Sequence, residues 1–287
     1  MSVTNLDKVL YPEAGFTKGE VIDYYARIAP ALLPHLRDRP LTVVRYPDGV
    51  AGKHFFEKNS PRHRPDWVRT TPIDVGSRGG TIEFAVCDDL PTLVWLAQLA
   101  AIELHPSLAT AADYERPTVL AFDLDPGAPA TIVECCAVAL RIRALFAELG
   151  LESFPKTSGS KGMQVYVPLN GDLTYETTKP YSHAVARALE SSEPDLVTSQ
   201  MTKSLRPGKV FVDWSQNTRT KTTVAAYSLR AREQPTASAP LTWDEVERAG
   251  DPDELRFTAA EVLERFERDG DPFAPVLELH QELPSGI

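Results

Sequence analysis

The sequence predicts an α+β fold, because its expected strands and helices do not alternate strictly as they do in a βαβ protein. Three apolar segments with the length of strands, at residues 118–122, 163–167 and 209–214, are each bounded by turn-forming or charged residues. Further strand-like segments nearer the amino terminus follow one another with no helical pattern between them. Strands and helices are therefore mixed along the chain.

The individual elements follow from local signals. Thr17 and Glu20 form a capping-box pattern ahead of a helix that ends near Pro40. The other expected elements are, in order, strands at 41–45, 54–57 and 81–86, a helix from about 91, the strand at 118–122, a helix at 130–149, the strand at 163–167, a helix at 176–190, the strand at 209–214, and helices at 242–250 and 258–268. A connector rich in Pro, Ala and Ser precedes the last two. We expect one compact region of two subdomains at residues 1–232, and the connector with a helical cap at 233–287.

Composition excludes several classes of protein. At 287 residues and 43% hydrophobic content, the chain has the make-up of an ordinary soluble globular protein. No apolar run approaches the roughly 18–20 residues of a membrane span, and no signal-peptide pattern opens the sequence. Three cysteines without Cys-x-x-Cys spacing argue against a disulfide framework or a zinc site. We expect a cytoplasmic, nucleoid-associated protein with no membrane contact.

The formal net charge of −10 is concentrated at one end of the chain. Residues 233–287 hold 14 acidic residues and 4 Lys or Arg, whereas residues 1–232 hold 26 of each. Within residues 203–232, seven Lys or Arg accompany the single acid Asp213. This locally basic segment indicates modest, salt-sensitive binding of nucleic acid, and the acidic segment is interpreted as a solvated helical face.

Three carboxylates follow two of the apolar strands. Asp123 and Asp125 come directly after residues 118–122, and side chains at i and i+2 of a strand share a face. Asp213 closes another apolar strand. Three carboxylates on two strand ends suit a pair of divalent ions roughly 3.5–4 Å apart, which is the arrangement of a phosphoryl-transfer site. The alternative is that each Asp caps a turn or pairs with an Arg.

A Lys-Thr-Ser-Gly-Ser-Lys-Gly segment at residues 156–162 precedes one of the predicted strands. Its glycines and hydroxyl groups permit a tight turn with exposed backbone N–H groups, and with the charge of Lys161 this suits a phosphate. The segment is not a Walker A loop, because that spacing is absent and a strand follows it. The alternative is an ordinary solvated turn.

In this order and spacing, these elements resemble the polymerase domain of bacterial ligase D, which belongs to the archaeo-eukaryotic primase superfamily. The similarity covers essentially residues 1–235 and extends through the segments 5–12, 17–18, 55–58, 104–105, 201–206 and 225–230. It implies a primase-polymerase fold in which an RRM-like catalytic sheet packs beside a second sheet, with helices around them. The sequence has no Lys-x-Asp-Gly adenylation motif, so we expect a stand-alone relative of that domain.

The resemblance implies roles for individual residues. Asp123 and Asp125 would bind two ions, Mn²⁺ or Mg²⁺, and Asp213 would complete the site of the ion that activates the primer 3′-hydroxyl. The nucleotide-binding residues that it implies are His105, Ser158, Gly159, Lys161, Gly162, Lys221 and Arg230. For the histidine and the cations, an ordinary structural or surface role is the alternative.

A second group of residues is expected to bind DNA. Lys8 and Lys18 match family residues that bind the 5′-phosphate on the downstream side of a gap, and two ammonium groups fit a terminal dianion. Phe55 and Phe56 are adjacent on a strand, so we expect one to enter the core and the other to stack on a base. The remaining expected contacts are Asn5, Arg45, Lys58, Lys203 and Arg206.

The predicted function is template-dependent addition of nucleotides, which fills short gaps or extends primers in the repair of DNA breaks. The expected substrates are gapped or primed DNA with a 5′-phosphate and either NTPs or dNTPs, with NTPs readily accepted. We expect a monomer whose partner, a DNA ligase or an end-binding protein, acts in trans. Three alternatives remain: a de novo primase, a non-catalytic nucleic-acid-binding relative, and an unrelated two-metal nuclease. The intact carboxylates count against the second, and the phosphate-binding turn counts against the third.

Overall fold

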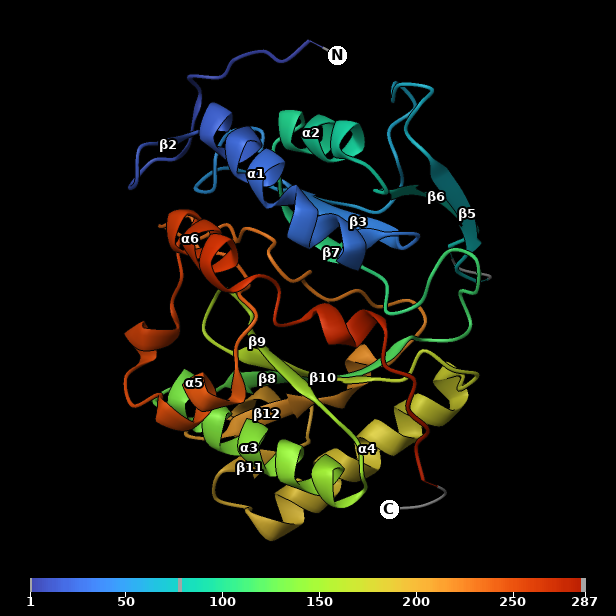
Figure 1. The fold of residues 1–287 in the computed structure, drawn as a ribbon, viewed down its shortest axis with the longest axis vertical. Helices are drawn as coiled ribbons and strands as arrows, with labels where there is room; N and C mark the ends of the chain where they lie inside the picture. Colours follow the sequence, from blue (N-terminus) through green and yellow to red (C-terminus); the bar gives the residue numbers. More distant parts are fainter. Residues whose placement is uncertain (1, 77–78, 285–287) are drawn as a thin grey trace. The chain divides into compact units, whose positions relative to one another are not determined.

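The computed structural model describes residues 2–76 and 79–284, which form two compact units (Figure 1). Unit 1 contains the described residues of Met1–Ala112, Thr222–Ser238 and Phe257–Gly270, and unit 2 contains those of Asp113–Lys221, Ala239–Arg256 and Asp271–Ile287. Both units therefore include segments from the last third of the chain. The division into residues 1–232 and 233–287 stays a prediction.

Unit 1 is built on an antiparallel sheet. Its strands are ordered β4 (Phe55–Glu57), β3 (Pro40–Arg45), β6 (Thr81–Val86) and β5 (Thr70–Asp74), and β7 (Ala101–Pro106) also pairs with β3. The other elements of this unit are α1 (Lys18–Leu36), α2 (Leu90–Gln98), α6 (Ala259–Asp269) and the short hairpin of β1 (Val9–Tyr11) and β2 (Phe16–Thr17). The helix α1 packs against both α2 and α6.

The start of α1 shows how the sequence specifies this unit. The Thr17 side chain accepts a hydrogen bond from the Glu20 N–H, and the Glu20 carboxylate accepts one from the Thr17 N–H at 2.7 Å. The predicted capping box is thus confirmed, and it satisfies two backbone donors that a helix end leaves unpaired. From the buried face of α1, the Tyr25 hydroxyl donates to the Ile102 carbonyl of β7, which ties the helix to the sheet.

Unit 2 contains a five-stranded sheet in the order β11 (Val197–Thr198), β12 (Val210–Asp213), β8 (Val119–Pro126), β10 (Met163–Pro168) and β9 (Phe154–Thr157). The helices α3 (Ile132–Glu148) and α4 (Tyr175–Ser192) lie on one face of this sheet, and α5 (Trp243–Arg248) packs beside α3 (Figure 1). Phe122 of β8 packs against Phe146 of α3, with 5.7 Å between ring centroids. Because side chains alternate along a strand, Asp123 and Asp125 face away from α3.

The α+β class and all six helices of the described residues were predicted correctly, within a few residues at each end. The strand β8 is longer than expected, since it continues through both aspartates to Pro126. The short strands β1, β2 and β11 were not predicted, and the longer strands β5, β7 and β9 were missed as well. Two of them contain a proline near the middle of the strand, and β7 carries polar residues on alternate positions. Within the described residues, no helix has the length and apolar character that a bilayer span requires.

Candidate active site

Three carboxylates lie on the face of the unit 2 sheet that points away from α3. Asp213 of β12 lies directly opposite Asp123 of β8 in the antiparallel register, and Asp125 is two residues further along the same face. Directly opposed Cβ atoms are roughly 4.5–5.5 Å apart in such a pair. The structure therefore places the three predicted metal ligands on one face of two neighbouring strands.

Two further polar residues, which sequence analysis missed, continue the row across the sheet. Gln164 of β10 lies opposite Asp123, and Lys156 of β9 lies opposite Gln164. The Gln164 amide donates a 3.0 Å hydrogen bond to Asp123 Oδ1, and the Lys156 side chain is fully buried. The position of Gln164 between the apolar residues of β10 was a usable signal, but only the pairing with β8 shows that it faces the carboxylates.

The electrostatics of this row favour cations. Burial raises the pKa of Asp123, the negative charges of Asp125 and Asp213 raise it further, and the bond from Gln164 and the charge of Lys156 act in the opposite direction, with a resulting pKa of about 7. A carboxylate whose ionisation is opposed by two neighbouring carboxylates gains from a positive ion. Oxygen-only ligand sets suit hard divalent ions such as Mg²⁺ and Mn²⁺, so these residues fit the predicted metals.

Asp213 is held by protein donors. Its Oδ1 accepts a 3.0 Å hydrogen bond from the Ser215 N–H, and its Oδ2 accepts one of 2.9 Å from the Gln216 amide. Lys221, a predicted triphosphate contact, has its Nζ 3.8 Å from Asp213 Oδ2 and bonds the Ser215 hydroxyl. Across the part of the chain that the structure describes, no three acidic, His or Cys side chains are arranged tightly enough to hold a metal ion. The hydrogen bonds from Ser215 and Gln216 occupy both carboxylate oxygens of Asp213, which an ion would otherwise bind.

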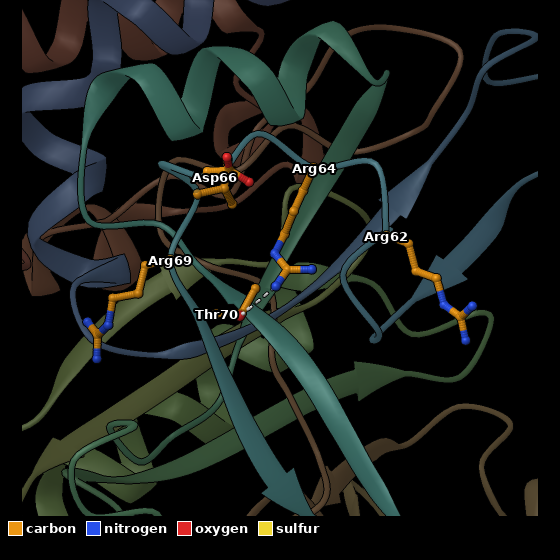
Figure 2. A pocket seen from close by; sticks show the side chains of 6 residues that line it. Arg62, Arg64, Asp66, Arg69 and Thr70 are labelled. Carbon is orange, nitrogen blue, oxygen red and sulfur yellow. Dashed lines mark hydrogen bonds between the residues drawn. The ribbon is translucent and has the colours of Figure 1, made fainter.

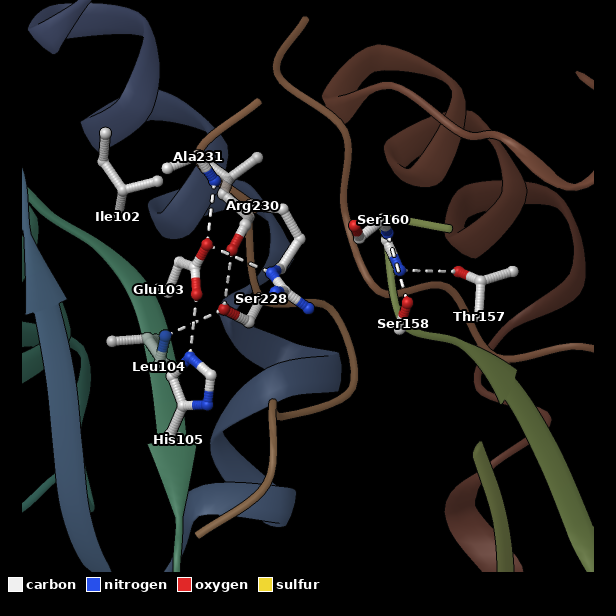
Figure 3. A network of polar contacts seen from close by, with 12 residues as sticks. Ile102, Glu103, Leu104, His105, Thr157, Ser158, Ser160, Ser228, Arg230 and Ala231 are labelled. Carbon is white, nitrogen blue, oxygen red and sulfur yellow. Dashed lines mark hydrogen bonds and ion pairs between the residues drawn. The ribbon is translucent and has the colours of Figure 1, made fainter. Parts of the chain in front are cut away.

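The turn after β9 is organised by hydroxyl groups (Figure 3). The Ser158 Oγ accepts hydrogen bonds from the N–H groups of Ser160 and Gly162, each at 3.3 Å, and the Gly159 N–H donates to Thr157 Oγ1 at the same distance. The N–H groups that we expected to be exposed thus point at hydroxyl oxygens. Bonds of this length are weak, so a phosphate oxygen is a stronger acceptor for the same donors.

Close packing explains the second glycine of the turn. A Cβ at Gly162 would lie 2.2 Å from the Leu124 carbonyl oxygen of β8, so no other residue fits without displacing the turn. Gly159 adopts a positive φ of 67°, a conformation that glycine adopts without steric cost. The Lys161 side chain is exposed beside them. The turn is therefore fixed against the strand that carries Asp123 and Asp125.

In unit 1, His105 and Arg230 are joined through a carboxylate that sequence analysis missed (Figure 3). Glu103 Oε2 is 2.9 Å from His105 Nε2, and Glu103 Oε1 is 3.1 Å from Arg230 Nε and accepts a 3.0 Å bond from the Ala231 N–H. Burial acts to raise the pKa of Glu103, but the His105 bond and the Arg230 charge lower it to about 2. Glu103 is therefore an anion that fixes both predicted nucleotide contacts. The sequence offered one signal for Glu103: it lies two residues before His105, so on a strand both side chains point to the same face.

The predicted 5′-phosphate lysines lie close together at the start of α1. Burial lowers the pKa of Lys18, and the nearby charge of Lys8 lowers it further. Lys18 Nζ donates to the Thr4 carbonyl at 2.9 Å, and Lys8 Nζ is 3.5 Å from Asp48 Oδ1. Asn5 has a positive φ of 56° in the turn before Lys8. Two ammonium groups beside a helix amino terminus form a favourable site for an anion.

The expectation for the two phenylalanines was wrong in part. Phe55 is 54% exposed and Phe56 58% exposed, so neither enters the core. Their strand, β4, has only three residues and lies at the edge of its sheet, where burial does not alternate. Phe56 lies near His105, with 6.0 Å between ring centroids. The adjacent Arg45 pairs with Glu57 at 2.8 Å.

The other predicted DNA contacts differ in how firmly they are held. Arg206 stacks on the Phe211 ring at 3.7 Å and donates to the Met201 carbonyl at 2.9 Å, which fixes its guanidinium within unit 2. Lys203 is exposed on a short 3₁₀ helix, and Lys58 follows β4 in unit 1. Their DNA contacts stay predictions.

Comparison with known proteins agrees with these features. A family model for the LigD primase-polymerase domain matches residues 17–273. The multifunctional non-homologous end joining protein LigD of Mycolicibacterium smegmatis is 44% identical over 276 residues, and the bifunctional LigD of Bacillus subtilis is 34% identical over 274 residues. These alignments cover 96% and 95% of this chain but only 36% and 43% of the relatives. The chain thus spans well under half of their length.

A solved structure extends the agreement to the fold. The polymerase domain of Mycobacterium tuberculosis ligase D, in complex with DNA, superimposes with a TM-score of 0.90 and 42% sequence identity, covering 96% of this chain and 98% of that one. The fold and the family match define a protein of the primase-polymerase class, to which template-directed nucleotidyltransferases belong. More narrowly, the chain belongs to the LigD primase-polymerase domain family. The predicted fold and resemblance are confirmed.

Proposed function

We propose that this protein adds nucleotides to DNA ends in a template-dependent manner during non-homologous end joining, filling short gaps or extending primers. The observation that carries the proposal is the register that places Asp213 opposite Asp123, with Asp125 on the same face. This arrangement supplies carboxylates from two strands, which a pair of divalent ions requires.

The chain's own residues prepare the carboxylates for two Mn²⁺ or Mg²⁺ ions. We assign Asp123 and Asp125 to both ions, and Asp213 to the ion that activates the primer 3′-hydroxyl. Gln164 orients Asp123 through its 3.0 Å bond, and Gln216 orients Asp213. The ions, when bound, neutralise the charge that develops on the transferring phosphoryl group.

The triphosphate is assigned to donors that the structure holds in place. In unit 2, the Ser158 hydroxyl, Lys161 and the backbone of Gly159 and Gly162 bind phosphate oxygens, and Lys221 adds a charge. In unit 1, His105 and Arg230 have the same role, and Glu103 fixes their orientation. Rigid donors lose little entropy when the substrate binds, which favours catalysis.

DNA binding is assigned to unit 1 and to the basic segment of unit 2. Lys8 and Lys18, with Asn5, bind the 5′-phosphate of a gap, and the exposed Phe55 and Phe56 stack on bases. Arg45, Lys58, Lys203 and Arg206 contact the backbone. The protein acts as a cytoplasmic monomer on nucleoid DNA, and a ligase or an end-binding protein acts with it in trans.

Primer extension tests the proposal. The substrate is a gapped, 5′-phosphorylated duplex, with NTPs or dNTPs and with Mn²⁺ or Mg²⁺. Asp123→Ala and Asp125→Ala should each abolish addition while DNA binding is largely retained, because the carboxylates are not phosphate ligands. Asp253→Ala, at a carboxylate that is 77% exposed, is the control and should extend normally. Normal extension by either active-site variant would exclude the metal assignment, and synthesis on an unprimed template would favour the primase alternative.

A further inference from the structure

A basic cavity lies beside the segment that joins β4 to β5. The cavity has a volume of about 390 Å³ and is lined by Arg62, Arg64, Asp66, Val68, Arg69 and Thr70 (Figure 2). Residues 58–69 carry four Lys or Arg against the single acid Asp66. The lining residues do not overlap those proposed to bind the metals, the triphosphate or DNA.

The segment is built as a fixed loop. Two successive turns are closed by the bonds from Arg64 N–H to the Pro61 carbonyl at 3.1 Å and from Val68 N–H to the Pro65 carbonyl at 3.0 Å. Both ends are tied to β6, since Ser60 N–H donates to the Glu83 carbonyl and Val86 N–H donates to the carbonyl of residue 69. Two prolines and four backbone bonds restrict the loop, so its side chains are presented at little entropic cost.

The three arginines have different electrostatic environments. Arg69 forms ion pairs with Asp38 and with Asp88, the latter at 2.7 Å, so its charge is already neutralised. Among the described residues, Arg64 bonds only the neutral Thr70 hydroxyl, at 3.3 Å. Arg62 is exposed and forms no hydrogen bond or ion pair with any residue that the structure describes. Two guanidinium charges are therefore available to an anion from outside the protein.

The same loop carries an exposed aromatic residue. Trp67 is 46% exposed and lies between Asp66 and Val68, both of which line the cavity. Guanidinium groups bind phosphates in two-pronged geometry, and an exposed indole stacks on a nucleobase of any sequence. Phosphate and base alternate along a single DNA strand, and in a single strand the bases are free to stack.

We propose that Arg62, Arg64 and Trp67 form a binding site for single-stranded DNA, where the guanidinium groups bind phosphates and the indole stacks on a base. This inference rests on the proposed function and deepens it, because a template strand that extends beyond the primer is the single-stranded DNA that such an enzyme must hold. The site is separate from the residues assigned to the 5′-phosphate and to the triphosphate.

The test measures binding without catalysis. The fluorescence anisotropy of a labelled oligothymidine is recorded over a series of salt concentrations, in EDTA and without nucleotide. Each lost phosphate contact lowers the slope of log affinity against log salt by about 0.7, so Arg62→Ala/Arg64→Ala should lower it by about 1.4. The control is Arg248→Ala/Arg256→Ala, which removes the same charge from exposed positions in unit 2 and should leave the slope unchanged.

Trp67 provides an independent readout. Trp67→Ala should weaken oligothymidine binding roughly 5- to 150-fold with the salt slope unchanged, and Trp67→Phe should restore most of it. Binding of a blunt duplex should be the same for both variants. An unaltered slope in the arginine variant, or unaltered affinity in Trp67→Ala, would overturn the site. Displacement of the DNA by an acidic peptide at lower concentration than by oligothymidine would overturn it in favour of a protein partner.

The result is independent of whether the proposed function holds. A wild-type protein that fails to extend any primer would refute the proposed function and leave the binding data unaffected. A wild-type protein that extends primers but does not bind oligothymidine at low salt would refute only the single-strand site.

Discussion

Replacing the buried anion Glu103 with glutamine should destabilise unit 1 in a pH-dependent manner. Glu103 is 7% exposed, and its contacts with His105 and Arg230 lower its pKa from an ordinary value of 4.5 to about 2. A carboxyl group whose pKa is lower in the folded than in the unfolded protein contributes stability above its unfolded pKa. That contribution is lost as the pH falls through the folded pKa.

The magnitude follows from the size of the shift. A difference of about 2.5 pKa units corresponds to about 3.4 kcal/mol at pH 7, of which about 1.4 kcal/mol remains at pH 3. Glu103→Gln resembles the protonated carboxyl group, so it should lower the free energy of unfolding by about 3 kcal/mol at pH 7 and by about 1 kcal/mol at pH 3. The buried guanidinium of Arg230 loses its partner, which acts in the same direction.

Urea denaturation of both proteins between pH 3 and pH 8 measures this difference. The control is Glu267→Gln, which removes the ion pair between Glu267 and Arg27 in the same unit. The Glu267 carboxylate is 61% exposed. Such exposed pairs contribute less than about 1 kcal/mol. If Glu103→Gln and the wild-type protein are equally stable at pH 7, or differ by the same amount at every pH, the ionic role of Glu103 is wrong.

Three further predictions concern the other parts of the site. Gly162→Ala should lower the free energy of unfolding by about 1–3 kcal/mol in thermal denaturation and should abolish nucleotide addition, because its Cβ would meet the Leu124 carbonyl at 2.2 Å; an active, equally stable variant contradicts the close approach. Lys8→Ala/Lys18→Ala should erase the preference for a 5′-phosphorylated gap, at roughly 1.5–3 kcal/mol for each well-formed contact, with primer extension mostly intact. No phosphate preference in the wild-type protein would remove this role. Mn²⁺ should raise the melting temperature of the wild-type protein more than that of Asp125→Asn, and equal shifts would place the ions elsewhere.

The helices were predictable because their signals are local. Thr17, Thr131, Thr242 and Thr258 each form a capping box with the glutamate three residues later, and the pattern is visible in the sequence. Strand pairing is not local. Nothing in the sequence near Asp213 states that it lies opposite Asp123: the strand-end pattern grouped the three carboxylates, and the family resemblance supplied their roles, but neither gave the register.

Burial on the strands was predicted less well for the same reason. Alternation correctly placed Asp123 and Asp125 on one face, since β8 is a central strand that is paired along both edges. The same rule failed for Phe55 and Phe56, because β4 lies at a sheet edge, a position that the sequence does not reveal. Glu103 was missed because its importance depends on Arg230, which is distant in sequence.

The charges of unit 2 suggest why the site tolerates three carboxylates. Lys156 lies two strands from Asp123, roughly 10 Å at the usual strand spacing, and a charge at that distance contributes about 1.7 kcal/mol at an effective dielectric constant near 20. Lys221, whose Nζ is 3.8 Å from Asp213 Oδ2, adds a second positive charge beside the three carboxylates. Two divalent ions carry four positive charges and a nucleoside triphosphate carries about four negative ones, so together they add almost no net charge. Ions alone, or triphosphate alone, leave a large excess of one sign. The residues of unit 2 should therefore bind the ions and the nucleotide cooperatively, each raising the affinity for the other.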